Sequence, residues 1–148
     1  MGKKHQQKGE YDKALQYYTK AAELGGVHAH WCLGALYYYG EGVEKDMKKS
    51  MYHLEEAAIG GHPDARYNLG ATEANAGNMN RALEHFMIAV EGGSHLSLKQ
   101  IKQFYSKGHA TKDDYAQALK AYQAYLAVIK SDGRDKAAEF NEIYKYYE

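Results

Sequence analysis

Apolar residues in this chain recur every three or four positions, which is the spacing of one face of an α-helix. Within residues 12–24 that face consists of Ala14, Leu15, Tyr18, Ala21 and Ala22. The same arrangement returns in three later segments, which begin near residues 50, 82 and 118. Glycine pairs at 25–26, 60–61 and 92–93 follow the first three segments, and glycine there is typical of a helix end. The pattern therefore predicts amphipathic helices that are separated by glycine turns.

Small residues also recur along the chain at a nearly constant interval. Matching positions of the four segments, spaced by 36, 32 and 36 residues, hold Ala14, Ser50, Ala82 and Ala118. A further helix fits before each of the last three segments, over residues 28–39, 64–76 and 96–106. A period of this length with two helices per unit predicts stacked helical hairpins, in which each unit buries its apolar face on the next.

We therefore expect an all-α fold, a right-handed α–α superhelical solenoid of about eight helices without a sheet. The spacing predicts a truncated first repeat, three full repeats and a C-terminal capping helix, over residues 1–27, 28–61, 62–93, 94–131 and 134–148. The sequence Ser-Asp-Gly at 131–133 predicts a break before the last helix. If the repeat spacing is counted back from Ala14, only the end of the first repeat's first helix remains, over residues 1–8. We thus expect an excised or engineered stretch of a repeat array.

Residues 29–50 read AHWCLGALYYYGEGVEKDMKKS. This stretch resembles the Sel-one-like repeat (SLR), a relative of the tetratricopeptide repeat (TPR), with the pattern A-x-x-x-L-G-x-x-Y-x-x-G-x-G-V-x-x-D-x-x-K-A. The matching residues are Ala29, Leu33, Gly34, Tyr37, Gly40, Gly42, Val43, Asp46 and Lys49, and Ser50 replaces the last alanine. The next copy keeps Ala65, Leu69 and Gly70 before it departs from the pattern. The resemblance covers about residues 9–133 and implies a non-enzymatic adaptor in the assembly of protein complexes.

Glycine has two expected roles within this pattern. Gly34 and Gly70 are expected where two helices cross, because a missing side chain lets the backbones approach. Gly40 and Gly42 are expected to adopt a positive φ, which other residues take only with strain.

Charge and cysteine content narrow the classes of function. The chain has 19 basic and 19 acidic residues and a formal net charge of zero, so nothing favours nucleic acid or an anionic membrane as partner. It has no apolar run of eighteen residues, so we expect no membrane span. The single cysteine, Cys32, excludes an intrachain disulfide framework. A reducing compartment such as the cytoplasm is therefore favoured, and the localisation stays open.

No pattern in the chain predicts catalysis, a cofactor or a metal site. The sequence has no nucleophile–base pairing, phosphate-binding glycine loop or carboxylate pair that stands out, so we do not expect an enzyme. His28 and Cys32 share a helical face, but His30 points away and structural zinc takes four ligands. The pair Asp113/Asp114 is expected to cap the helix that follows it.

The first helices of such hairpins line the inner, concave wall of the array. By register we expect a partner-binding surface there, made of His28, Trp31, Tyr38, Tyr67, Asn75, Lys99 and Gln103. Aromatic side chains carry much of the binding energy at interfaces, so Trp31, Tyr38 and Tyr67 would be central. The alternative interpretation is structural: these aromatic side chains only pack neighbouring helices together. A clamp for a C-terminal carboxylate is not expected, because only Lys99 suits it.

The leading hypothesis from the sequence is a non-enzymatic scaffold or adaptor that binds a protein or peptide on the concave face. The alternative is an excised or engineered array with a purely structural or self-assembling role. Homo-oligomers are conceivable through the open repeat ends. The C-terminal segment carries five apolar or aromatic residues for such a contact: Phe140, Ile143, Tyr144, Tyr146 and Tyr147.

Overall fold

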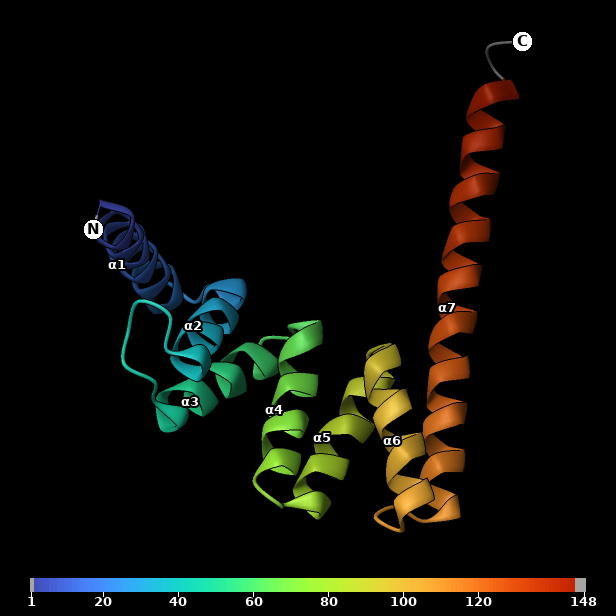
Figure 1. The fold of residues 1–148 in the computed structure, drawn as a ribbon. Coiled ribbons are helices and arrows are strands. Elements are labelled where there is room, and N and C mark those ends of the chain that lie inside the picture. The colour runs from blue at the N-terminus through green and yellow to red at the C-terminus, as the bar shows by residue number, and fades with distance from the viewer. Residues whose placement is uncertain (1, 146–148) are drawn as a thin grey trace. The chain divides into compact units, whose positions relative to one another are not determined.

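The computed structural model describes the backbone of residues 2–145 and the side chains of residues 8–133. In that part of the chain every regular element is an α-helix, and no strand occurs (Figure 1). The seven helices are α1 (Gly2–Glu23), α2 (Val27–Tyr39), α3 (Met47–Ile59), α4 (Pro63–Asn75), α5 (Met79–Glu91), α6 (His95–Lys107) and α7 (Lys112–Lys145). The all-α helical repeat fold is thus confirmed, whereas its right-handed sense stays a prediction. None of the described helices is long and apolar enough to cross a membrane.

The chain forms two compact units, Met1–His85 and Phe86–Glu148. The boundary lies within α5, so this helix contributes its first half to one unit and its second half to the other. The repeat boundaries inferred from the sequence stay predictions.

The helices of the first unit pack in chain order. α1 packs on α2, α2 packs most extensively on α3, and α3 packs on α4. Leu33 of α2, Leu54 of α3 and Leu69 of α4 form the core, and none of them is more than 3% exposed. These leucines lie on the apolar faces that the spacing predicted, because residues three and four apart meet on one side of a helix.

The turns lie where the glycine pattern placed them. Gly25 and Gly61 have φ angles of 89° and 88°, in the left-handed region that favours glycine. Gly40 and Gly42 also have positive φ, at 69° and 72°, as the sequence predicted. A Cβ atom at Gly42 would collide with Tyr11 of α1, so this loop lies directly against the first helix.

Gly34 marks the crossing of α2 and α3, as expected. A Cβ atom at this position would lie 2.9 Å from Leu54 Cγ. The buried Ser50 hydroxyl donates a hydrogen bond to the Gly34 carbonyl, with an O···O distance of 2.7 Å. The small residues of the repeat therefore allow α2 and α3 to approach closely, and Ser50 adds a bond that alanine could not make.

The second unit is built on the packing of α6 against α7. Its buried residues include Phe86, Val90, Ile101 and Phe104. The rings of Phe86 and Phe104 meet edge to face, with centroids 5.6 Å apart. Tyr125 of α7 lies against Gly93, where a Cβ atom would collide with its ring.

Two predicted helix breaks are wrong. α1 continues through Gly9, where the sequence analysis ended one helix near residue 8, and α7 continues through Gly133 instead of beginning anew at residue 134. Both glycines have open surroundings and neither has positive φ. A glycine inside a helix costs about 1 kcal/mol relative to alanine, which good helix formers on both sides outweigh. The C-terminal aromatic residues suggested for self-association lie outside the described side chains.

Polar side chains begin several helices. The Asp46 carboxylate accepts from the Lys49 N–H at 3.1 Å, and the Ser94 hydroxyl accepts from the Ser97 N–H at 3.1 Å. Before α7, the Thr111 hydroxyl accepts from the Asp114 N–H, and the Asp114 carboxylate accepts from the Thr111 N–H. This reciprocal pair is a capping box.

The capping prediction at Asp113/Asp114 thus needs correction. Only Asp114 joins the capping box, and Thr111 occupies the N-cap position. A carboxylate three residues into the helix fits the capping box, because its oxygen reaches back to the N–H of the cap residue.

Candidate functional site

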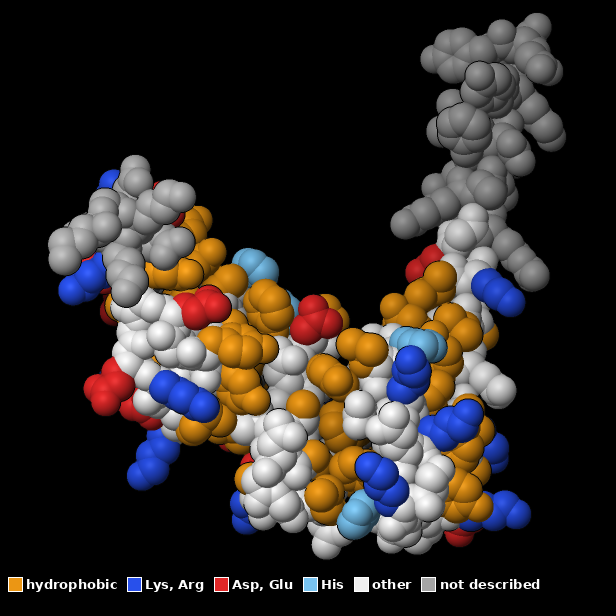
Figure 2. Space-filling view, viewed as in Figure 1, with side chains coloured by type: hydrophobic (Ala, Val, Ile, Leu, Met, Phe, Trp, Pro, Cys, Tyr) orange, Lys and Arg blue, Asp and Glu red, His pale blue; other side chains and the backbone are white. Residues whose placement is uncertain are grey.

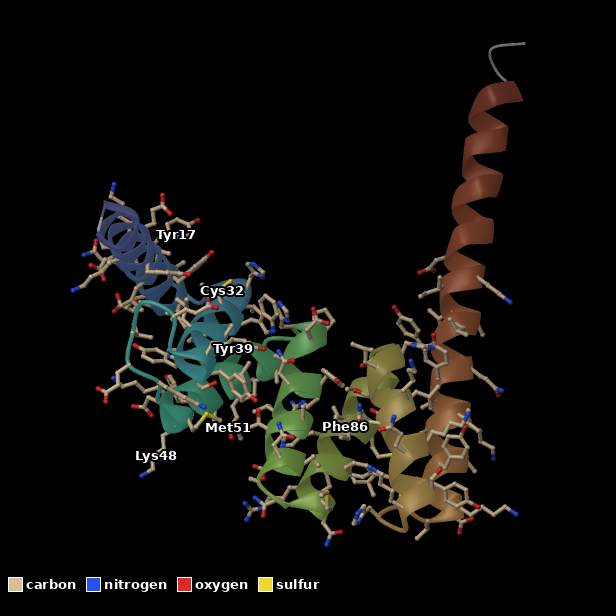
Figure 3. All side chains as sticks on the ribbon, in the orientation of Figure 1. Tyr17, Cys32, Tyr39, Lys48, Met51 and Phe86 are labelled. Atoms are coloured by element: carbon tan, nitrogen blue, oxygen red, sulfur yellow. The ribbon has the colours of Figure 1, made fainter. Side chains whose placement is uncertain are left out.

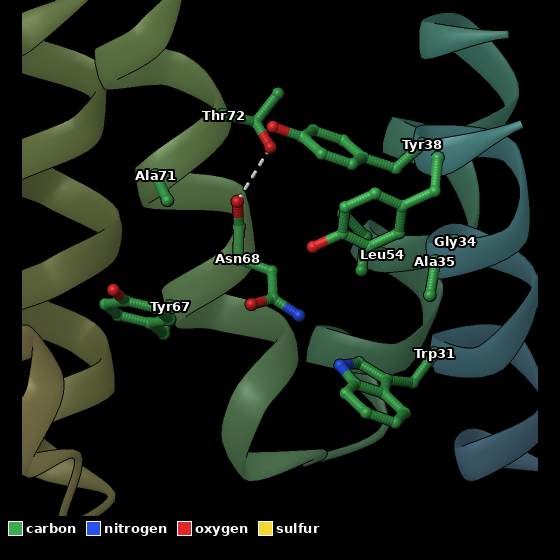
Figure 4. Close-up of a pocket in the computed structure, with 10 residues that line it drawn as sticks. Trp31, Gly34, Ala35, Tyr38, Leu54, Tyr67, Asn68, Ala71 and Thr72 are labelled. Atoms are coloured by element: carbon green, nitrogen blue, oxygen red, sulfur yellow. Dashed lines mark hydrogen bonds between the residues drawn. The ribbon is translucent and has the colours of Figure 1, made fainter. Parts of the chain in front are cut away.

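The first unit has a hollow between α2 and α4, which we call the aromatic hollow (Figure 4). Its volume is about 390 Å³. It is lined by Trp31, Gly34, Ala35, Tyr38, Tyr39, Leu54, Tyr67, Asn68, Ala71 and Thr72. Because α2 and α4 are the first helices of successive hairpins, this is the helix set that the sequence analysis assigned to the inner wall.

The floor of the aromatic hollow follows from the helical spacing. Gly34, Ala35 and Ala71 have little or no side chain, so they leave space between the larger residues around them. Trp31 and Tyr38 are seven positions apart on α2, which brings them to the same helix face two turns apart. From α4, Asn68 points toward α2 (Figure 4), and Tyr67 is also among the residues that line the hollow.

The aromatic hollow has no ionisable acid or base in its lining apart from tyrosine. Its polar groups are tyrosine hydroxyls, the Asn68 amide, the Trp31 indole nitrogen and the Thr72 hydroxyl. Thr72 Oγ1 donates to the Asn68 carbonyl at 2.8 Å, within α4 (Figure 4). Elsewhere on the first unit, acidic and basic side chains are mixed with exposed hydrophobic ones (Figure 2). The hollow therefore suits a neutral ligand segment better than a charged one.

Two histidines hold the Trp31 ring at the end of the aromatic hollow. Its centroid lies 5.5 Å from that of His28 and 4.9 Å from that of His62, and both pairs are stacked. The two imidazole centroids are 5.6 Å apart, so the imidazoles lie side by side over the indole and do not enclose it. His28 Nδ1 and His62 Nε2 are 3.4 Å apart, which links α2 to the start of α4.

The indole N–H of Trp31 has no hydrogen-bond acceptor among the described residues, and the nitrogen is buried. A buried donor without an acceptor costs free energy, about 1–3 kcal/mol, so such atoms are uncommon in folded proteins. In Figure 4 the indole reaches from α2 toward α4. The unpaired donor is thus located at the hollow.

A second hollow adjoins the first and shares Tyr38 and Thr72 with it. Its volume is about 440 Å³. The remaining lining residues are Lys45, Met47, Met51, Glu73, Asn75, Ala76 and Asn78. Since the two hollows share residues, they adjoin each other, and we call the pair the groove; its first compartment is aromatic and neutral and its second is mixed in charge.

The structure brings together only part of the predicted binding surface. Trp31, Tyr38 and Tyr67 line the aromatic hollow, and His28 stacks on Trp31 beside it. Asn75 lines the adjoining compartment. Lys99 and Gln103 are exposed on α6, which belongs to the second unit, so they contribute nothing to this groove.

The sequence analysis missed several residues of the site. Tyr39, Asn68 and Thr72 line the aromatic hollow, and His62 holds Trp31. His62 precedes a proline that begins α4, a pattern that places it next to a helix start. Tyr39 and Asn68 each follow a predicted inward position by one residue, and Thr72 lies three residues before Asn75, so the predicted inward face was narrower than the real one.

A second histidine pair links α2 to α3. His30 Nδ1 and His53 Nδ1 are 3.0 Å apart, and the two ring centroids are 5.3 Å apart. The Tyr37 ring stacks on His53 at 5.8 Å. Because the two nitrogens share one proton as donor and acceptor, at least one of these rings is neutral in this arrangement.

Burial affects the titration of the histidines and of the thiol. The pKa of His53 is lowered, chiefly by burial and then by His30. Burial also lowers the pKa of His62. It raises the pKa of the Cys32 thiol on α2 (Figure 3), and a weaker interaction with Tyr18 of α1 acts in the opposite direction. A thiol with a raised pKa is a poor nucleophile at neutral pH, so the surroundings of Cys32 do not activate it for catalysis.

No group of three or more His, Cys, Asp or Glu side chains in the described part of the chain is arranged to hold a metal ion. Cys32 Sγ and His28 Nε2 do approach to 3.5 Å, as their shared helical face predicted. His28 directs its other ring nitrogen to His62, so these three side chains do not converge on one point.

The stacked hairpins, the leucine core at equivalent repeat positions and the groove between first helices define an α-helical repeat solenoid. A family model, the Sel1 repeat, matches residues 3–26 and 27–62. Residues 3–62 are thus matched by Sel1 repeats, and the Sel1-like relatives and structures described next support an SLR family protein.

Among curated proteins, the chain is 24% identical over 140 residues to an uncharacterised Sel1-like repeat-containing protein of Schizosaccharomyces pombe, covering 93% of this chain and 21% of that protein. It is 29% identical over 129 residues to an exopolysaccharide production negative regulator of Rhizobium meliloti, covering 84% and 45%. It is 33% identical over 63 residues to an ERAD-associated E3 ubiquitin-protein ligase component of Arabidopsis thaliana, covering 43% and 10%. The chain thus spans less than half the length of these relatives.

Two solved structures have a similar fold. A protective antigen of uropathogenic Escherichia coli that displays an SLR fold superposes with a TM-score of 0.62 at 30% identity, covering 73% of this chain and 24% of that one. A Sel1 repeat protein from Oxalobacter formigenes superposes with a TM-score of 0.64 at 27% identity, covering 80% and 50%.

Proposed function

We propose that this chain is a non-enzymatic scaffold that binds a peptide segment of another protein in the groove between α2 and α4. Sel1 repeat proteins are in general protein-interaction scaffolds, which supports the coarse assignment. The observation that carries the finer assignment is the aromatic hollow, which is lined by Trp31, Tyr38 and Tyr67 together with small residues.

Three features of the groove support peptide binding. Aromatic side chains contribute large contact areas and are enriched where binding energy concentrates. The two compartments together offer an elongated surface that an extended segment could follow. The side chains around Trp31 are already held by contacts with His28 and His62, so binding orders few new groups.

A random-peptide display library selected against the immobilised chain tests this function. We expect selected peptides to bind saturably, and Tyr67→Ala to weaken them at least tenfold. The matched control is Tyr17→Ala, which removes an equally large side chain that is 69% exposed on α1 and does not line the groove. The proposal fails if no peptide is selected, or if both variants bind like the wild type.

A structural or self-assembling role is the second candidate. It is favoured by the apolar residues that α7 exposes, Leu126, Val128 and Ile129. Leu126 and Ile129 are three positions apart and therefore share one helix face, which can pair with a second copy. Mass measured over a wide concentration range separates this candidate from peptide binding by a monomer.

A further inference from the structure

We propose that the aromatic hollow binds a proline-rich segment in the polyproline II conformation. This inference rests on the proposed function and specifies the chemistry of the partner. It follows from the charge, the shape and the hydrogen-bonding groups of the hollow, which each exclude other ligand classes.

The first argument is charge. None of the ten residues that line the aromatic hollow is Lys, Arg, His, Asp or Glu. A phosphopeptide or a terminal carboxylate needs cationic donors, and a basic peptide needs carboxylates, because a desolvated charge without a partner is costly. Lys45 and Glu73 occur only in the adjoining compartment, and their signs are opposite. The segment in the aromatic hollow is therefore uncharged.

The second argument is shape. Trp31 and Tyr38 from α2 and Tyr67 from α4 line the hollow together with small residues, so the lining combines aromatic rings with positions that leave space. Grooves that bind polyproline II segments are lined by aromatic rings in this way, with proline rings packed between them. Proline rings are compact and apolar, and they bring no flexible side chain that must be ordered on binding.

The third argument is hydrogen bonding. The Trp31 indole can only donate, and it lacks an acceptor among the described residues. A polyproline II segment has no internal hydrogen bonds, so its carbonyls are available, and proline has no N–H that would be left unpaired in the hollow. A ligand carbonyl that displaces the lining atoms over the indole nitrogen would satisfy this donor. The hollow thus matches a segment rich in acceptors and poor in donors.

Oligosaccharides are the strongest rival, because sugars also stack on aromatic rings. Each sugar hydroxyl donates as well as accepts, so its burial calls for many acceptors. The hollow has no carboxylate to accept from such hydroxyls, and its side-chain acceptors are the Asn68 amide oxygen and the hydroxyl oxygens of Thr72 and the tyrosines. The observations therefore favour the peptide, and binding of a sugar becomes one outcome of the test.

The test uses the fluorescence of Trp31, which is the only tryptophan of the chain and lies at the proposed site. The probes at pH 7.5 are a proline-rich decapeptide, the same peptide with alanine for each proline, its all-D form, and chitohexaose. We expect saturable change in Trp31 emission with the proline-rich peptide. The alanine and all-D peptides should bind at least tenfold more weakly, and chitohexaose should leave the emission unchanged.

Two variants locate the binding. Ala71→Phe fills the hollow from α4 and should weaken the proline-rich peptide at least tenfold, with helical circular dichroism retained. The matched control is Ala116→Phe at an exposed position of α7, which should bind like the wild type. The peptide series on the unmodified chain stays decisive if Ala71→Phe does not fold.

The outcomes separate this inference from the proposed function. Equal binding of the alanine and proline-rich peptides overturns the polyproline II assignment and leaves peptide binding intact. The polyproline II assignment also fails, and peptide binding stays intact, if display selects peptides without proline that compete with the proline-rich peptide for the site at Trp31. If chitohexaose alone changes Trp31 emission, the peptide assignment is wrong. If no peptide of any kind binds, both proposals fail.

Discussion

At the residue scale, the close approach of α2 and α3 depends on Gly34. A Cβ atom there would lie 2.9 Å from both Leu54 Cγ and Leu54 Cδ2, and 3.4 Å from the Ser50 carbonyl oxygen. Leu54 is 3% exposed, so it has little room to move away. Position 34 thus requires a small residue because of packing and not because of backbone conformation.

Replacing Gly34 with alanine should therefore lower the free energy of unfolding by about 1–3 kcal/mol, the usual range for overpacking. The matched control is Gly133→Ala in α7, where a Cβ atom meets open space. That change should stabilise the helix by up to about 1 kcal/mol. Urea unfolding followed by circular dichroism measures both effects, and equal signs would contradict the packing role of Gly34.

The capping box before α7 distinguishes two adjacent aspartates. Asp114→Ala removes the acceptor of the Thr111 N–H and should cost about 1 kcal/mol. Asp113→Ala should cost only a few tenths of a kcal/mol, from the lost interaction of its charge with the helix dipole. The comparison uses the urea midpoints of the two variants, and a larger loss for Asp113→Ala would refute this assignment.

At the element scale, histidine pairs join α2 to both of its neighbours. His30 bonds to His53 of α3, and His28 approaches His62 at the start of α4. His62 Nδ1 also accepts from the Asp64 N–H at 3.3 Å, so this ring caps α4. Protonation of both rings of either pair would place two positive charges side by side and remove the shared hydrogen bond.

The first unit should consequently lose stability on acidification. The pKa of His53 is lowered in the folded chain, first by burial and then by His30, with Lys49 acting in the same direction and Glu56 against it. The unfolded state, with histidine near its usual pKa of about 6.5, then binds more protons than the folded state. The stabilisation is complete above that pH and is lost as the pH falls below it toward the folded pKa.

Urea unfolding at pH 7.5, 6.5 and 5.5 measures this dependence. The unfolding free energy should decrease toward pH 5.5, and His53→Gln should make the decrease smaller, whatever its effect at pH 7.5. His95→Gln, on the exposed side of α6, is the control and should leave the slope unchanged. A slope that is the same in wild type and His53→Gln would exclude a role for this pair.

At the scale of the whole molecule, the two units differ in what they present to solvent. The first unit carries the groove between α2 and α4. The second presents an exposed apolar stretch on α7, where Val128 is 61% exposed and Ile129 is 47% exposed. The proposed binding role concerns the first feature, and a self-assembling role would concern the second.

Self-association through α7 predicts that mass rises with concentration above the 16.7 kDa of one chain. Ile129→Glu should then restore the monomer mass, because a charge in an apolar contact is costly to desolvate. Ile59→Glu, at an exposed apolar position of α3, is the control and should leave the association unchanged. Light scattering that gives one constant mass over the whole concentration range would remove the self-assembling candidate.

Local patterns in the sequence determined most of the fold. Helical periodicity located the apolar faces, and glycines such as Gly25 and Gly61 located the turns, because a positive φ is a property of a single residue. The SLR-like stretch at residues 29–50 predicted the helix crossing at Gly34. The helical register predicted that aromatic residues of α2 belong to the binding surface. These features depend on neighbours three or four positions away, which a single sequence displays directly.

Tertiary structure alone decided the continuity of the longest helices and the composition of the groove. Gly9 and Gly133 resemble the turn glycines in sequence, yet they lie within α1 and α7, because no packing or left-handed conformation ends the helix there. The groove depends on how α4 packs relative to α2, which brings Asn68, Thr72 and His62 to Trp31 across more than thirty positions. Periodicity says which side of a helix is buried, but only the packed structure determines which side chains meet between two helices.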